Sequence, residues 1–132
     1  MKILYIITGF SVGGAGVITV NLASYMQRKG HTVKVMYLSG KRFVQVPDSI
    51  EIINLYMKKN PFELVDALRK AKKIIKGYNP DLVHANMFHA ILFSRLLRIM
   101  CPIKKEIDTV HTINIQSKIR MLLLRITDFC QT

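Results

Sequence analysis

Residues 1–38 read MKILYIITGFSVGGAGVITVNLASYMQRKGHTVKVMYL, and this stretch decides the fold. Residues 3–7 form a short apolar run rich in β-branched side chains, which is typical of a strand covered on both faces. A loop with glycines at 9, 13, 14 and 16 follows, then a helical pattern, then a second apolar run at 31–38. A unit of about 36 residues in this order has the size of a right-handed βαβ crossover.

The start of the chain also has features of a secretory signal peptide, since Met1-Lys2 precedes an apolar run and small residues. The strand is the better interpretation because strand, loop, helix and strand follow without a break. Within the helix, apolar residues recur at helical spacing and predict its buried face. Cationic residues and Gly30 indicate where the helix ends. The predicted buried residues are Ile18, Leu22, Tyr25 and Met26.

The rest of the chain repeats the alternation. A short strand is predicted at 50–55, a strand at 80–85 and a strand at 105–112, with helices at 88–100 and 117–129. Asn60-Pro61 predicts the start of another helix, which Gly77 would end. Its buried stripe would be Leu64, Leu68, Ala71 and Ile75, and its other face Arg69, Lys70, Lys72, Lys73 and Lys76. The alternation predicts one α/β domain with a Rossmann-like, doubly wound, mostly parallel sheet.

Composition narrows the class of protein. Half of the 132 residues are hydrophobic, so a disordered chain is not expected. No apolar run approaches the length that spans a bilayer. Cys101 and Cys130 lie far apart without a C-x-x-C motif, which indicates reduced thiols and a cytoplasmic protein.

The chain is strongly basic, with 20 Lys and Arg against 8 Asp and Glu. Residues 58–76 and residues 95–125 each carry seven positive and two negative side chains. Such helices are either solvated faces or docking surfaces for anionic partners. A membrane surface is one such partner. Specific nucleic-acid binding is disfavoured because no zinc knuckle, RNP-like aromatic motif or heptad zipper is present.

The glycine loop lies where ligands bind in parallel sheets, beyond the carboxyl ends of the strands. Glycines permit close backbone approach, and a helix N-terminus suits an anion. The spacing is not G-x-G-x-x-G, and the second strand ends without the acidic residue of a nicotinamide site. No Walker A lysine follows, and residues 8–16 hold no acidic side chain for a flavodoxin-like regulatory module. A turn that only packs remains an open interpretation.

Two of the four histidines are candidate functional residues. His84 and His111 each fall near the carboxyl end of a predicted strand, where an imidazole can donate a hydrogen bond to a hydroxyl or phosphate. His31 and His89 are expected to be structural. No pair has metal-ligand spacing, so no metal site is predicted. No serine or cysteine occupies a nucleophile elbow.

Three segments together resemble the N-terminal domain of family 4 glycosyltransferases, which are retaining enzymes of the GT-B fold. They are residues 1–38, NPDLVHANMFHAILFSRLLRI at 79–99, and TVHT at 109–112. The match covers most of the chain and is most similar to bacterial enzymes of surface-polysaccharide synthesis. The resemblance implies transfer of a sugar from a nucleotide-sugar donor to a saccharide or lipid-linked acceptor, with no metal or other cofactor.

The resemblance also implies residue roles. Gly13 and Gly14 would face the donor diphosphate and the acceptor, and His111 would reach the donor sugar beside the reacting carbon. His84 would support the acceptor side, together with Asn86, which replaces the second histidine of the family motif. Gly16 and Val17 replace the usual Glu-Arg.

The family's second domain, which binds the nucleotide sugar with two glutamates eight positions apart, has no counterpart among Glu51, Glu63 and Glu106. Residues 1–132 are therefore expected to be part of an N-terminal, acceptor-side domain that is inactive alone and prone to self-association. The expected location is the cytoplasm, at the inner face of the plasma membrane. The alternative function is a non-enzymatic Rossmann-like binding module, or a basic protein that binds nucleic acid or a membrane surface.

Overall fold

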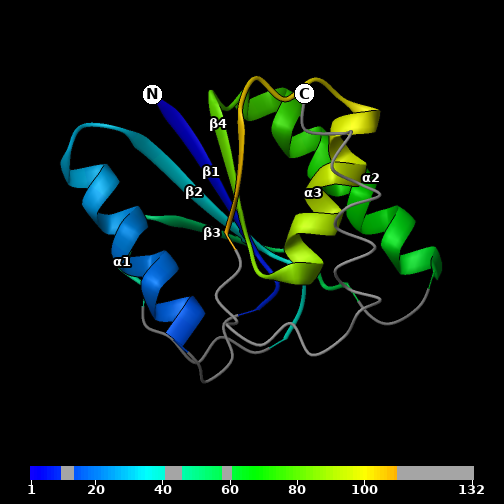
Figure 1. Ribbon diagram of the computed structural model, residues 1–132, viewed down its shortest axis with the longest axis horizontal. Coiled ribbons are helices and arrows are strands. Elements are labelled where there is room, and N and C mark those ends of the chain that lie inside the picture. Colours follow the sequence, from blue (N-terminus) through cyan, green and yellow to red (C-terminus); the bar gives the residue numbers. More distant parts are fainter. Residues whose placement is uncertain (10–13, 41–45, 58–60, 110–132) are drawn as a thin grey trace.

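The computed structural model describes residues 1–9, 14–40, 46–57 and 61–109. These residues form one parallel sheet in the order β3-β2-β1-β4-β5 (Figure 1). The sheet confirms the Rossmann-like α/β fold predicted from the alternation of strands and helices. The strands are β1 (Lys2–Ile7), β2 (Thr32–Tyr37), β3 (Glu51–Asn54), β4 (Leu82–Asn86) and β5 (Glu106–Thr109).

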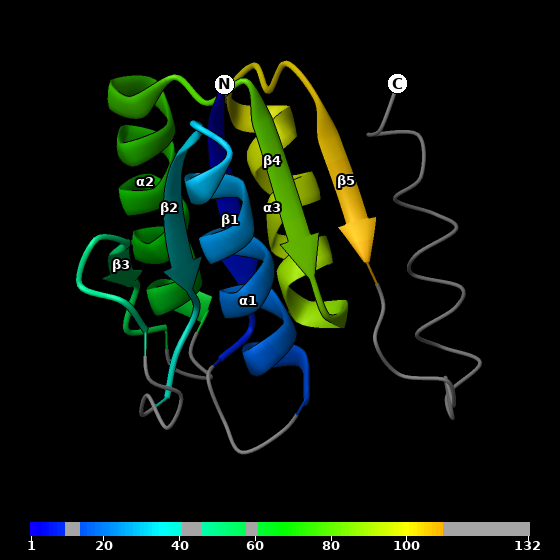
Figure 2. The same cartoon turned by 90° about the vertical axis from the view of Figure 1, so that its left-hand side faces the viewer.

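Helices cover both faces of this sheet (Figure 2). α1 (Gly14–Arg28) lies on one face, and α2 (Pro61–Tyr78) and α3 (Phe88–Met100) lie side by side on the other. The chain moves from β1 to β2 in one direction and from β4 to β5 in the other, so right-handed crossovers place α1 and α3 on opposite faces. The predicted helix at 117–129 lies outside the described residues.

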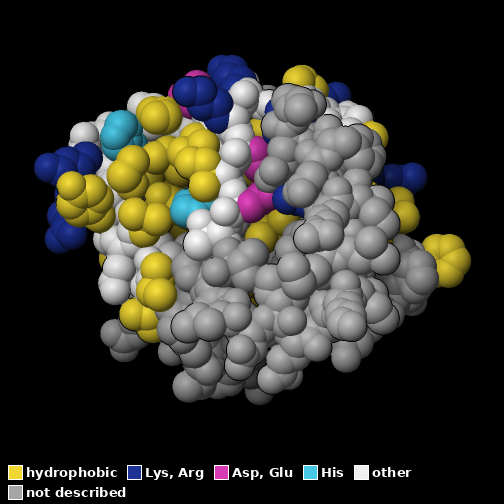
Figure 3. Space-filling view, viewed as in Figure 1, with side chains coloured by type: hydrophobic (Ala, Val, Ile, Leu, Met, Phe, Trp, Pro, Cys, Tyr) yellow, Lys and Arg dark blue, Asp and Glu magenta, His cyan; other side chains and the backbone are white. Residues whose placement is uncertain are grey.

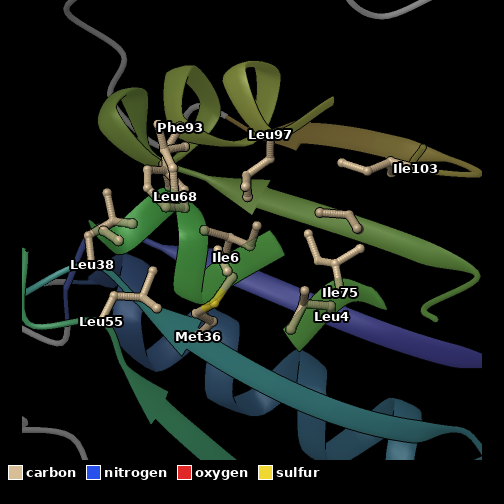
Figure 4. Packing of buried hydrophobic residues seen from close by; sticks show 14 of the residues in the cluster. Leu4, Ile6, Met36, Leu38, Leu55, Leu68, Ile75, Phe93, Leu97 and Ile103 are labelled. Carbon is tan, nitrogen blue, oxygen red and sulfur yellow. The ribbon is translucent and has the colours of Figure 1, made fainter. Parts of the chain in front are cut away.

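β1 contributes side chains alternately to two cores. Leu4 and Ile6 point toward α2 and α3, where they pack with Met36, Phe93 and Leu97 (Figure 4). The alternate side chains of β1 point toward α1. All of them are buried, which explains why the strand reads as a continuous apolar run rather than an alternating one. The α1-side set from this strand is Ile3, Tyr5 and Ile7.

The predicted buried face of α1 is wrong for two of its four residues. Ile18 and Tyr25 are half exposed, and the residues that pack fully against the sheet are Thr19, Val20 and Ala23. These smaller side chains let the helix lie close over the bulky strand residues beneath it. Leu22 and Met26 flank the contact and are partly buried.

α2 runs one residue past the predicted end, since Gly77 is helical and Tyr78 is the last residue of the helix. The Tyr78 ring is buried, and its hydroxyl donates a hydrogen bond to the Thr32 carbonyl oxygen at 2.9 Å. Asn79 then turns the chain with a positive φ of 51°. The predicted stripe of α2 is confirmed, with Leu68, Ala71 and Ile75 buried and Leu64 packed against the same core. None of the helices in the described ranges is long and apolar enough to cross a membrane.

Two neighbouring leucines of α3 test the packing. Leu97 is 0% exposed and Leu96 is 40% exposed. We expect Leu97→Ala to lower the free energy of unfolding by about 3 kcal/mol, because it leaves a cavity in the core. Leu96→Ala should change it by less than about 0.5 kcal/mol. Urea titration followed by circular dichroism measures both, and equal losses would contradict this assignment of the core.

Candidate functional site

The carboxyl edge of the sheet is the candidate site. Ile7 at the end of β1 aligns with Tyr37 of β2 and with Asn86 of β4, and Asn86 aligns with Thr109 of β5. α1 and α3 both begin at this edge, on opposite faces of the sheet (Figure 1). The strands after β1 are added on one side of it, and those from β4 on are added on the other, so the strand order reverses between β1 and β4. In open α/β sheets, ligands bind in the crevice at such a switch point.

Thr8, the first residue after β1, links the end of β1 to α3 and to the segment after β2. The Ala90 N–H in the first turn of α3 donates to the Thr8 hydroxyl oxygen at 3.3 Å, and the Ser39 N–H donates to the Thr8 carbonyl at 3.3 Å. A Cβ at Gly9 would lie 2.9 Å from the Ser39 carbonyl oxygen, so a side chain there would force the backbone apart. Gly9 is thus explained by packing, the interpretation that the sequence left open for the loop.

Gly14 is the first residue of α1, as expected for a glycine at a helix N-terminus facing the edge. Gly13 lies outside the described residues, and so does His111. The structure therefore does not test their predicted roles. β5 ends at Thr109, two positions before His111 in the sequence.

Met87, between β4 and α3, has a strained backbone with φ 76° and ψ 154°. Positive φ is uncommon outside glycine, and such strain gathers at functional sites. The conformation is held because the Met87 N–H donates to the Thr109 carbonyl at 3.0 Å and its own carbonyl accepts from the Ile91 N–H. The Met87 side chain does not cap α3; instead the hydroxyl of Thr8, the residue after β1, accepts from the Ala90 N–H in the first turn. Sequence reasoning missed Thr8, Met87 and Thr109, because their roles depend on strand register.

His84 lies further inside the sheet than predicted. It is the third of five residues in β4 and aligns with Tyr5, two residues before the strand ends. It reaches the edge through a hydrogen bond of 2.7 Å between its Nε2 and the Thr109 hydroxyl oxygen. Its ring lies 5.4 Å from the Tyr5 ring, tilted by 43°. Burial raises the pKa of Tyr5 to about 12, so the phenol beside the imidazole is neutral.

Asn86 occupies the last position of β4 and is buried. The structure thus brings Asn86, Thr109 and the start of α1 to one edge of the sheet. His84 lies two residues further from that edge than Asn86 and is hydrogen-bonded to Thr109. Figure 3 shows hydrophobic side chains gathered between α1 and β4, with histidine side chains at their margin. Ile107 of β5 adds to this surface and is 47% exposed.

The cations of α3 do not form the solvated basic face expected from residues 95–125. Arg95 is buried, and its Nε and Nη2 both donate to Asp108 Oδ2, at 3.3 Å and 2.9 Å. Arg98 Nη1 lies 3.5 Å from Glu106 Oε2, and the Glu106 side chain is 0% exposed. These pairs join α3 to β5. The sequence showed the net charge of this region but not which acidic side chains on a strand would face the helix.

Burial raises the pKa of the Glu106 carboxyl above its usual 4.5, and the Asp108 charge adds to the rise. The Ser94 hydroxyl and the guanidinium groups of Arg98 and Arg95 oppose it only in part. Neither Glu106 oxygen has a hydrogen bond of good geometry within the described part of the chain. The charged form of this carboxyl is therefore destabilised by folding.

Within the same described ranges, no group of three His, Cys, Asp or Glu side chains is arranged to hold a metal ion. Cys101 is a buried free thiol whose Sγ donates to the Leu97 carbonyl at 3.3 Å. What the edge offers chemically is two helix N-termini, an amide, a hydroxyl and an imidazole, which can orient a phosphate-bearing or hydroxyl-bearing ligand.

Comparison with known proteins identifies the class. Residues 12–129 match the family described as Glycosyltransferase Family 4, so the chain belongs to that family. No curated protein sequence matches it significantly. The fold is that of GT-B glycosyltransferases and related enzymes.

Three solved structures illustrate the similarity of the fold. Sucrose-phosphate synthase from Thermosynechococcus elongatus has a TM-score of 0.72 and 13% identity, over 96% of this chain and 40% of that one. A glycosyltransferase from Rickettsia africae has a TM-score of 0.63 and 24% identity, over 94% and 34%. UDP-GlcNAc 2-epimerase from Neisseria meningitidis, bound to UDP-GlcNAc, has a TM-score of 0.62 and 14% identity, over 99% and 39%. This chain spans 34–40% of these proteins.

Replacing Glu106 tests the buried carboxyl at the α3–β5 contact. A carboxyl with a raised folded-state pKa stabilises the fold at low pH and loses that stability as the pH rises from 4.5 through the raised value. We therefore expect Glu106→Gln to be more stable than the parent at pH 7, with the difference shrinking toward pH 5. Urea midpoints across this pH range measure the difference in stability between the two proteins.

The control is Glu51→Gln, at an exposed pair with Lys34, which should change stability by less than about 1 kcal/mol. A parent protein that is more stable than Glu106→Gln at pH 7 would contradict this account.

Proposed function

We propose that this chain forms the acceptor-side wall of the crevice of a retaining glycosyltransferase. The enzyme would transfer a sugar from a nucleotide-sugar donor to a saccharide or lipid-linked acceptor in the synthesis of a bacterial surface polysaccharide. The observation that carries the proposal is the family match over residues 12–129, on a sheet whose switch point lies between β1 and β4.

The edge suits the proposed roles. The N-terminus of α1 at Gly14 carries a partial positive charge and exposes N–H groups, which favour a diphosphate. Gly13, just before it, would allow the same close approach. Asn86 and His84, the latter placed by Thr109, would hold acceptor hydroxyl groups. His111 would act at the reacting carbon of the donor sugar.

The donor would be held mainly by a second α/β domain. The chain spans about two fifths of the solved proteins that it matches, and the Neisseria epimerase of the same fold is bound to a nucleotide sugar. Retention of configuration needs both walls around a developing positive charge at the sugar carbon. No metal or additional cofactor is part of the proposal. The proposed location is the cytoplasm, at the inner face of the plasma membrane.

A titration of the ¹⁵N-labelled chain with UDP-glucose, UDP-GlcNAc and GDP-mannose tests the proposal. We expect no release of nucleoside diphosphate by the 132-residue chain. We expect weak binding that shifts the amide signals of Gly14, Asn86 and Met87 and leaves those of Thr32 and Asp81, at the opposite edge, unchanged.

Inorganic sulfate is the control, because a chain with a net charge of +12 attracts any anion. Turnover by the chain alone would overturn the need for a second domain. Shifts confined to the opposite edge, or identical to those with sulfate, would overturn the crevice and favour a binding module of another kind.

A further inference from the structure

β5 meets α3 through charged side chains. Residues of a strand point alternately to its two faces, so Glu106 and Asp108 lie on the face that α3 covers. Their partners on the helix are Arg98 and Arg95. Among the described residues, neither hydrophobic cluster contains a residue of β5, and Ile107 on its other face is 47% exposed. The position of this strand against α3 therefore depends on ion pairs rather than on apolar packing.

Of the two pairs, the one between Arg95 and Asp108 is better placed to fix the strand. Their side chains are 5% and 12% exposed. Nε and Nη2 of the guanidinium both donate to Asp108 Oδ2, so two hydrogen bonds from one planar group hold this oxygen. The contact between Arg98 and Glu106 is longer, at 3.5 Å, and lies at the other end of β5.

Arg95 lies on a helix that is itself anchored to the middle of the sheet. Phe93 and Leu97 of α3 are buried in the same core as the side chains of β1. The Ala90 N–H, in the first turn of α3, donates to the hydroxyl oxygen of Thr8, the residue after β1. The backbone that carries Arg95 therefore has a fixed position relative to β1.

Thr109 connects this ion pair to the candidate site. It directly follows Asp108 and is the last residue of β5. Its hydroxyl oxygen lies 2.7 Å from His84 Nε2, and its carbonyl oxygen accepts from the Met87 N–H at 3.0 Å. A movement of Asp108 relative to α3 would therefore change the hydrogen bonds of both His84 and Met87.

We propose that Arg95 is a positioning residue of the candidate site. Through Asp108 it sets the position of Thr109, and Thr109 orients the His84 ring. In the proposed function this ring holds an acceptor hydroxyl group. A role of Arg95 in acceptor recognition rests on that proposed function, whereas the link from Arg95 to His84 does not.

Stability alone does not account for a buried ion pair at this contact. Removing two charges from water costs about as much free energy as their attraction returns, and apolar side chains can often replace such a pair without loss of stability. An apolar contact has no preferred direction, whereas a guanidinium and a carboxylate meet in a defined geometry. The pair between Arg95 and Asp108 is therefore better explained by the position that it imposes on β5.

The ring nitrogen signals of His84 in the ¹⁵N-labelled chain test the proposal, because their chemical shifts depend on tautomer and hydrogen bonding. Thr109→Val removes the hydroxyl and defines the change expected when the link is lost. Arg95→Lys keeps a positive charge beside Asp108 but lacks the planar group. We expect Arg95→Lys to move the His84 signals at least about half as far as Thr109→Val does, and to speed exchange of the Met87 amide about tenfold or more.

The matched control is Arg98→Lys, at the pair with Glu106, which should leave both measurements unchanged. A second control combines Arg95→Lys with Thr109→Val. Because Thr109→Val already breaks the link, Arg95→Lys should move the His84 signals no further in that background.

A third variant separates position from stability. Arg95→Met combined with Asp108→Leu replaces the ion pair by apolar side chains. We expect this variant to unfold at a urea concentration close to that of the parent, yet to move the His84 signals as Arg95→Lys does. It also tests the proposal if Arg95→Lys alone does not fold.

Four results would overturn the proposal. One is a folded Arg95→Lys or apolar variant with the His84 signals of the parent. Another is an equal movement of these signals in Arg98→Lys, which would show a general loosening of β5. A third is an equal effect of Arg95→Lys with and without Thr109→Val, which would show that Thr109 does not carry the effect. The fourth is failure of both the Arg95→Lys and the apolar variant to fold, which would assign the pair to stability.

None of these measurements involves a sugar donor or acceptor. Failure of the link from Arg95 to His84 therefore leaves the proposed function untouched, and failure of the nucleotide-sugar titration leaves the link untouched.

Discussion

The parallel pairing of β1 with β2 on one side and β4 on the other is the constraint on which the rest of the structure depends. This pairing places β1 in the middle of the sheet, where helices bury both of its faces and its side chains divide between two cores. It also aligns Ile7 with Asn86, which fixes the switch point. Thr8, the next residue, can then cap the first turn of α3 while its carbonyl accepts from Ser39. The candidate site is a consequence of this register.

The sequence predicted the order and type of every described strand and helix, because apolar runs and helical spacing are local signals. It did not predict which side of α1 is buried. Ile18 and Tyr25 are large and apolar, so the sequence predicted them to be buried. The residues of α1 that are buried against the sheet are instead the smaller Thr19, Val20 and Ala23. For the candidate site, the sequence placed His84 near the carboxyl end of its strand. Its actual position depends on where β4 ends, and its link to Thr109 depends on pairing with β5.

The charge distribution follows a similar logic. Sequence counting treated the cations of α2 and α3 alike, yet the two helices use them differently. Arg95 and Arg98 are drawn inward because β5 places Asp108 and Glu106 on the face that α3 covers. α2 meets no such strand and keeps its cations in solvent. The chain thus belongs to glycosyltransferase family 4, and the two helices on one face of its sheet differ in chemistry. This difference suggests separate roles for the sheet edge and for the outer surface of the helices.

Native-state hydrogen exchange tests the central role of β1 most directly. If β1 holds both halves of the sheet together, the amides of Leu4, Tyr5 and Ile6 should exchange only through global unfolding, with the full denaturant dependence of that reaction. The amides of β3 and β5, each described with one neighbouring strand, should exchange through smaller openings. Exchange of β1 amides through a local opening, while β5 remained protected, would contradict the account.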